Sequence, residues 1–112
     1  MGKINSRSKG KRGELEWAKE VQSKTGFASR RGQQYSGSPD SPDVISDGLP
    51  IHWEVKRVES GNPYKWLAQA KADAGPERLP VVAHRRNDQE WVIVLAADDF
   101  LDLINTVYQT DE

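Results

Sequence analysis

Cysteine is absent from the 112-residue chain, which excludes disulfides, thiolate catalysis and zinc sites built on cysteine. Histidine is scarce, since His52 and His84 are the only two, and no Ser-His-Asp spacing or phosphate-cradling glycine loop is evident. No apolar run approaches the roughly 18 residues that span a bilayer, and no signal-peptide core is present. We therefore expect a cytoplasmic protein without a membrane segment.

The length indicates one domain with one modest core. Charge is divided unevenly, because residues 1–35 hold nine Lys/Arg and three Glu, whereas residues 36–112 hold seven Lys/Arg and 14 Asp/Glu. A basic leading segment is typical of phosphate binding, and the acidic remainder argues against broad wrapping of nucleic acid. We expect a flexible basic segment at residues 1–10 and a single domain at residues 11–112.

Helical and strand-like patterns alternate along the chain. The expected elements are a helix from about Lys11 to Lys24, an irregular strand within Phe27–Tyr35, strands at Asp43–Ser46 and Ile51–Val58, a helix from Asn62-Pro63, a central hairpin of Leu79–Arg85 and Glu90–Ala96, and a helix from Asp98 or Asp99. In the last helix, the apolar residues Phe100, Leu103, Ile104 and Val107 are predicted to face inward. This order predicts an α/β fold with a mixed sheet.

Two carboxylates and a lysine are predicted to share one face of the hairpin formed by residues 43–58. If the connecting loop is Gly48-Leu49, Asp43 lies directly opposite Glu54. If the loop lies one residue earlier, Asp43 faces His52 and Glu54 is its diagonal neighbour. Both registers place Lys56 beside Glu54, because alternate residues of a strand point to the same face. A loop of three residues would instead put Asp43 on the opposite face from Glu54 and Lys56.

Carboxylates this close destabilise a sheet unless something neutralises them. A hard divalent cation such as Mg²⁺ does so, Lys56 could hold a water or a phosphate, and Glu14, on the inward stripe of the first helix, could complete the metal shell. Each residue also has an ordinary interpretation: a Glu54–Lys56 salt bridge, a turn position for Asp43 and a surface position for Glu14.

Together, Pro42-Asp43, Glu54-Val55-Lys56 and the upstream Glu14 resemble the PD-(D/E)xK nuclease superfamily. The closest resemblance is to small archaeal and phage nucleases similar to Holliday-junction resolvases, and it extends from about residue 9 to residue 104. It implies a restriction-endonuclease-like α/β fold, with a mixed central β-sheet of about five strands flanked by three helices.

The resemblance also implies the activity. An endonuclease of this kind hydrolyses DNA phosphodiester bonds with Mg²⁺ or Mn²⁺, on Holliday junctions or other branched DNA during recombination, in a bacterial, archaeal or phage-infected cell. Glu14, Asp43, Glu54 and the Val55 carbonyl would bind the metal, and Lys56 would position the attacking water. Acting on two strands suggests a homodimer, for which the last helix is a candidate interface.

Candidate contacts to DNA are basic residues near the start of the chain and one polar residue of the helix after the strand Ile51–Val58. They are Lys9, Lys11, Arg12, Arg30, Arg31 and Gln69. Two alternatives from other classes stay open. The chain could be a non-catalytic nucleic-acid-binding or assembly module on the same fold, or a membrane-recruited adaptor, because its start, MGKINS, matches the myristoylation pattern.

Overall fold

A computed structural model describes residues 6–32 and 42–109 of the chain. Its elements are α1 (Ser6–Thr25), β1 (Ser29–Arg31), β2 (Val44–Ser46), β3 (Ile51–Lys56), α2 (Pro63–Ala74), β4 (Leu79–His84), β5 (Val92–Val94) and α3 (Ala97–Tyr108). Helix α1 begins at Ser6, so the described part of the segment expected to be flexible is helical. Most of the MGKINS pattern lies outside the described residues.

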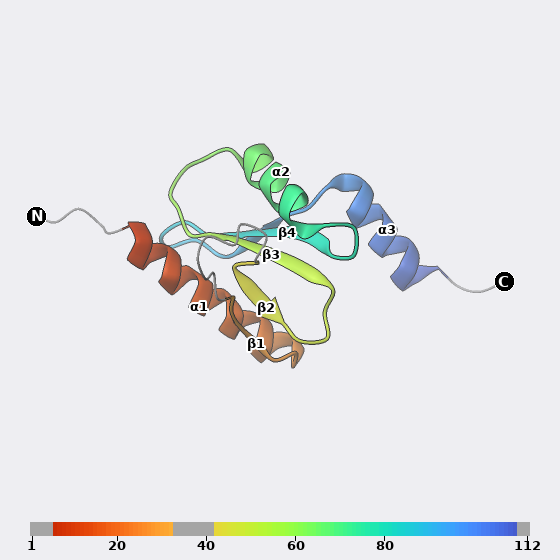
Figure 1. Ribbon diagram of the computed structural model, residues 1–112, viewed down its shortest axis with the longest axis horizontal. Coiled ribbons are helices and arrows are strands. Elements are labelled where there is room, and N and C mark those ends of the chain that lie inside the picture. Colours follow the sequence, from red (N-terminus) through yellow and green to blue (C-terminus); the bar gives the residue numbers. More distant parts are fainter. Residues whose placement is uncertain (1–5, 33–41, 110–112) are drawn as a thin grey trace, which may run out of the picture.

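The five strands form one mixed sheet in the order β1-β2-β3-β4-β5. Neighbours are antiparallel except β3 and β4, which run parallel and are connected by α2. Three helices accompany this sheet, as Figure 1 shows, so the predicted α/β fold of the restriction-endonuclease type is confirmed. The hairpin of β4 and β5 is confirmed as well, although β5 lies at the edge of the sheet rather than at its centre.

The hydrophobic core lies between α1 and one face of the sheet. Trp17 packs edge-on against Trp53 of β3, with ring centroids 5.2 Å apart, and its ring also contacts Trp91 at 5.0 Å. Val44 and Val55 are buried in the same cluster. This arrangement confirms the predicted apolar side of β3 and the inward stripe of the first helix.

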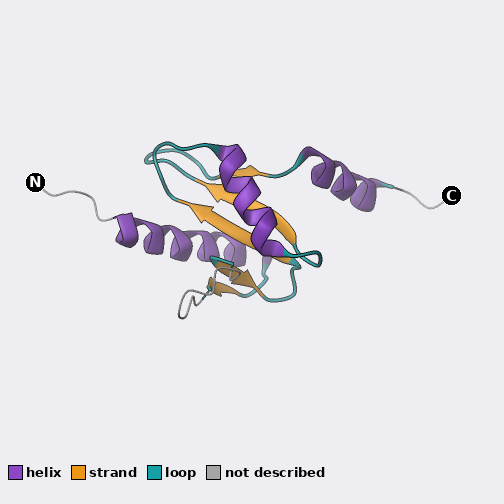
Figure 2. Ribbon diagram, turned by 45° about the horizontal axis from the view of Figure 1, so that its top comes forward, coloured by secondary structure: helices purple, strands orange, loops and turns teal. Residues whose placement is uncertain are grey.

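Helix α2 covers the opposite face of β3 and β4, as Figure 2 shows. The helix begins where the Asn62 side chain accepts hydrogen bonds from the backbone N–H groups of Tyr64 and Lys65, at 2.9 and 3.4 Å. It ends before Gly75, whose φ of 72° is readily adopted only by glycine. Ala70 and Val82 are fully buried. The polar side of β3 therefore lies under a helix.

Helix α3 corrects one prediction. It extends away from the sheet (Figures 1 and 2), and its side chains of Phe100, Leu103, Ile104 and Val107 are 36% to 68% exposed. The prediction that they face inward was therefore wrong. The period of the sequence correctly gave an apolar face, but no element of the described chain packs extensively on it. None of the described helices has the length and apolar character needed to cross a membrane.

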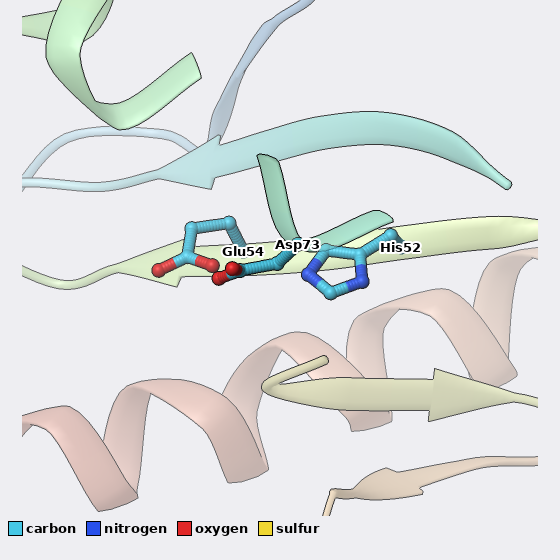
Figure 3. Close-up of side chains that lie close together, drawn as sticks. All are labelled: His52, Glu54 and Asp73. Atoms are coloured by element: carbon cyan, nitrogen blue, oxygen red, sulfur yellow. The ribbon is translucent and has the colours of Figure 1, made fainter. Parts of the chain in front are cut away.

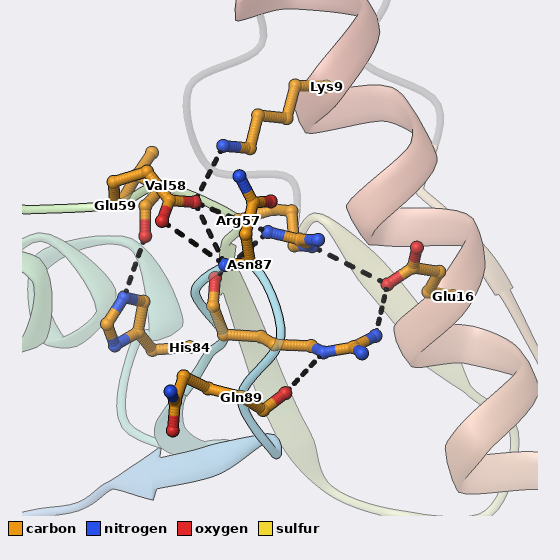
Figure 4. Close-up of polar contacts among 9 residues, drawn as sticks. Lys9, Glu16, Arg57, Val58, Glu59, His84, Asn87 and Gln89 are labelled. Carbon is orange, nitrogen blue, oxygen red and sulfur yellow. Dashed lines mark hydrogen bonds and ion pairs between the residues drawn. The ribbon is translucent and has the colours of Figure 1, made fainter.

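A polar network fastens α1 to the end of β3 and to the turn between β4 and β5 (Figure 4). Glu59 accepts hydrogen bonds from Lys9 Nζ at 2.8 Å and from the Asn87 backbone N–H at 3.0 Å, and these bonds hold the pKa of its carboxyl below the ordinary value. Glu16 forms ion pairs with Arg57 at 3.6 Å and with Arg85 at 3.1 Å. The network fixes the position of α1 relative to the strand that carries the candidate site.

Candidate active site

Asp43 lies where β2 separates from β3. Its backbone N–H donates to the Trp53 carbonyl at 2.9 Å, and Val44 pairs with Trp53. This is the register predicted for a Gly48-Leu49 loop, so the alternative that sets Asp43 opposite His52 was wrong. The Asp43 Oδ2 atom accepts a hydrogen bond from the Val55 N–H at 2.8 Å. A side chain thus takes the place of a backbone ladder bond and fixes this carboxylate beside β3.

Glu54 and Lys56 extend from the same face of β3, with Lys56 Nζ 3.7 Å from Glu54 Oε2. Only 12% of the Glu54 side chain is exposed, against 30% for Lys56. The N–H and C=O of one strand residue point to the same neighbouring strand, so the Val55 carbonyl faces the Asp43 side of β3. The structure therefore brings together Asp43, Glu54, Val55 and Lys56.

The electrostatics of this group are unfavourable without a cation. Burial raises the pKa of Glu54 to about 7, and the Asp43 carboxylate adds to the rise. Lys56 opposes it, whereas Asp73 of α2 raises the pKa further. Asp43, Glu54 and Asp73 thus place three carboxylates beside a single lysine in a half-buried position. Their oxygen atoms suit a hard divalent cation.

His52 and Asp73 extend this cluster along β3. Figure 3 shows the side chains of His52, Glu54 and Asp73 directed toward one another in front of the strand, and one ligand atom from each lies within 4.8 Å of the others. His52 is fully buried. Gln69 donates a hydrogen bond to Asp73 Oδ2 at 2.9 Å, one helical turn away.

Sequence reasoning missed Asp73, and it placed His52 on the face of Glu54 without including it among the site residues. Asp73 shares a face of α2 with Ala70, which is fully buried against the sheet, but that burial is visible only in the structure, so the sequence offered no signal for Asp73. The alternation of β3 correctly put the His52 and Glu54 side chains on one face, and what it did not show is that Asp73 approaches them from α2.

Glu14 has a different partner from the one expected. Its Oε1 atom accepts a hydrogen bond from Arg31 Nε at 2.8 Å. Arg31 pairs with Val44, whose side chain lies in the core on the α1 side of the sheet. Directly paired residues point to the same face, so Glu14 lies on the α1 side, whereas Glu54 lies on the α2 side.

Four of the six candidate contacts to DNA have protein partners. Lys9 pairs with Glu59, Arg30 with Asp47 at 2.9 Å, Arg31 with Glu14, and Gln69 with Asp73. Lys11 and Arg12 are exposed on α1.

Comparison with known proteins identifies the family of the chain. Neither the curated proteins nor the solved structures include a match to the chain. A family model described as "Phage putative PDDEXK endonuclease" matches residues 5–111, which is nearly the whole chain. Asp43, directly before β2, and Glu54-Val55-Lys56 in β3 are of the residue types that appear in the name of this family. The chain therefore belongs to the phage PDDEXK endonuclease family.

Proposed function

We propose that the chain is a metal-dependent endonuclease that hydrolyses phosphodiester bonds of DNA, with branched DNA such as the four-way junction as its preferred substrate. One observation carries the proposal: Asp43 is fixed against the Val55 N–H at 2.8 Å, beside Glu54 and Lys56, where β2 separates from β3. Membership of an endonuclease family supports the reaction class.

In the proposed mechanism, Asp43, Glu54 and the Val55 carbonyl would hold Mg²⁺ or Mn²⁺. When bound there, such an ion would supply Lewis acidity toward the phosphate and would lower the pKa of water. The Lys56 ammonium, beside Glu54, orients the attacking water or neutralises charge that develops on the phosphate. Hydrolysis leaves a 5′-phosphate and a 3′-hydroxyl. For Glu14 to assist the metal, its side chain would have to leave Arg31 and cross from the α1 side of the sheet to the side of Glu54.

The proposed DNA surface joins the start of α1 to the cluster on β3. Lys11 and Arg12 would bind phosphates directly, while Lys9, Arg30 and Arg31 would do so by exchanging their present partners for DNA. We also propose a homodimer formed through the exposed apolar face of α3, because two active sites can cut two strands. The proposed location is the cytoplasm of a phage-infected cell.

A cleavage assay tests the proposal. Labelled four-way junction, flap, duplex and single-stranded DNA are incubated with Mg²⁺, Mn²⁺ or chelator. We expect metal-dependent cutting that is lost in Glu54→Ala and Lys56→Ala and retained in Asp98→Asn, an exposed acidic residue of α3 far along the chain from the site. Cutting that survives both substitutions in β3 would contradict the mechanism. Binding of DNA without cutting would favour a binding module.

A further inference from the structure

We propose that His52, Glu54 and Asp73 form a second divalent-cation position that shares Glu54 with the Asp43 position and selects Mn²⁺ over Mg²⁺. The proposal rests on the proposed function only in sharing Glu54. His52 and Asp73 have no part in the mechanism given above, and they come from two elements, β3 and α2.

The fold determines the geometry of this position. His52 and Glu54 are two residues apart on β3 and point toward the face that α2 covers, and Asp73 approaches them from the last turn of α2 (Figure 3). When each bond is about 2.2 Å long, ligands opposed across one ion lie about 4.4 Å apart and adjacent ligands lie about 3 Å apart. The three ligand atoms lie within 4.8 Å of one another, so side-chain rotations would have to bring them closer around an ion.

The donor set determines which ion fits. When this position alone is occupied, the Glu54 and Asp73 carboxylates balance the charge of one divalent ion, and the neutral imidazole adds no charge. Mg²⁺ prefers oxygen donors and keeps several waters. Imidazole favours transition metals, and affinity rises from Mn²⁺ through the later first-row ions. Because His52 is fully buried, its ring is held in place at little further loss of rotamer freedom on binding.

Gln69 acts on this position as a positioning residue. Its side-chain N–H bonds to Asp73 Oδ2 at 2.9 Å, which leaves Oδ1 of that carboxylate for an ion. Hydrogen bonds of this kind orient metal ligands, and their loss typically reduces metal affinity by about 10- to 100-fold. The structure thus gives Gln69 a role other than contact with DNA.

Mn²⁺ binding to the full chain tests the proposal without reference to cleavage. Pulsed electron paramagnetic resonance should show ¹⁴N coupling from a directly bound imidazole, and this coupling should disappear in His52→Asn. Calorimetric titration should give at least about tenfold weaker Mn²⁺ binding in Asp73→Asn and in Gln69→Ala, with ¹⁴N coupling retained in Gln69→Ala. Asp98→Asn should bind Mn²⁺ like the original chain.

Two results would overturn the proposal: a Mn²⁺ spectrum without nitrogen coupling, or wild-type affinity in Asp73→Asn. Should His52→Asn fail to fold, the original chain and the α2 variants still decide the matter. The outcomes also separate this inference from the proposed function. Nitrogen-coupled Mn²⁺ in a chain that never cuts DNA contradicts only the nuclease, whereas cutting without nitrogen coupling contradicts only the second position.

Discussion

Replacing Glu54 with glutamine should make the metal-free protein more stable at alkaline pH. The folded chain holds the Glu54 proton with a pKa of about 7, against an ordinary value of 4.5. At about 1.4 kcal/mol per pH unit this difference corresponds to about 3 kcal/mol, and partial solvation of the carboxylate reduces it to about 2 kcal/mol. Since the folded state binds the proton more tightly, stability is lost as the pH rises from about 4.5 to 7.

Thermal unfolding in chelator between pH 5 and pH 8.5 measures this effect. Glu54→Gln should melt about 8 °C above the original chain at pH 8, at about 4 °C per kcal/mol for a domain of this size, and the difference should shrink toward pH 5. Glu59→Gln is the matched control of opposite sign, because its contacts with Lys9 and Asn87 lower the pKa and the variant should melt below the original chain at pH 8. Equal melting of Glu54→Gln and the original chain at pH 8 would refute the reasoning.

Three further predictions concern α1 and α3. Gly13→Ala should lower the melting temperature, because a Cβ there would overlap the Arg57 side chain. Gly10→Ala, with open space around it, should raise stability by about 1 kcal/mol. A gain in both variants would contradict the close approach of Gly13 to Arg57. Arg12→Ala should weaken binding to all DNA forms alike and reduce the salt slope of binding by about 1, as read from titrations at several salt concentrations. Phe100→Glu should shift the chain from dimer to monomer in sedimentation. The substitution should leave the melting temperature of the monomer itself unchanged, since this ring is 53% exposed. A monomeric original chain would exclude the proposed dimer.

Local patterns were sufficient to predict most of the fold. The Asn62-Pro63 start of α2 follows from side-chain capping and a fixed φ, and the alternation in β3 follows from the pleat. The exposure of α3 could not be predicted in this way. A helical period shows that a helix has an apolar face, but it does not show which surface covers that face, as the half-exposed Phe100 illustrates.

The candidate site was predictable only along β3 and its hairpin partner. Asp43, Glu54 and Lys56 follow from strand register, which depends on counting residues across one turn. The position of Asp73 depends on how α2 crosses the sheet, and the position of Glu14 depends on its ion pair with Arg31. Both are set by packing between elements distant in sequence, and no spacing rule within one element encodes them.

Strand β3 carries His52, Glu54, Val55 and Lys56 within one short segment, and this has a consequence for how the gene can vary in length. Deleting or inserting one residue inside β3 would exchange its two faces, turning Trp53 toward α2 and the acidic groups toward the apolar layer under α1. A change of two residues would keep the faces but shift every group by one pleat, away from Asp43 and Asp73. Viable length variants should therefore fall outside β3, at the surface turns between elements.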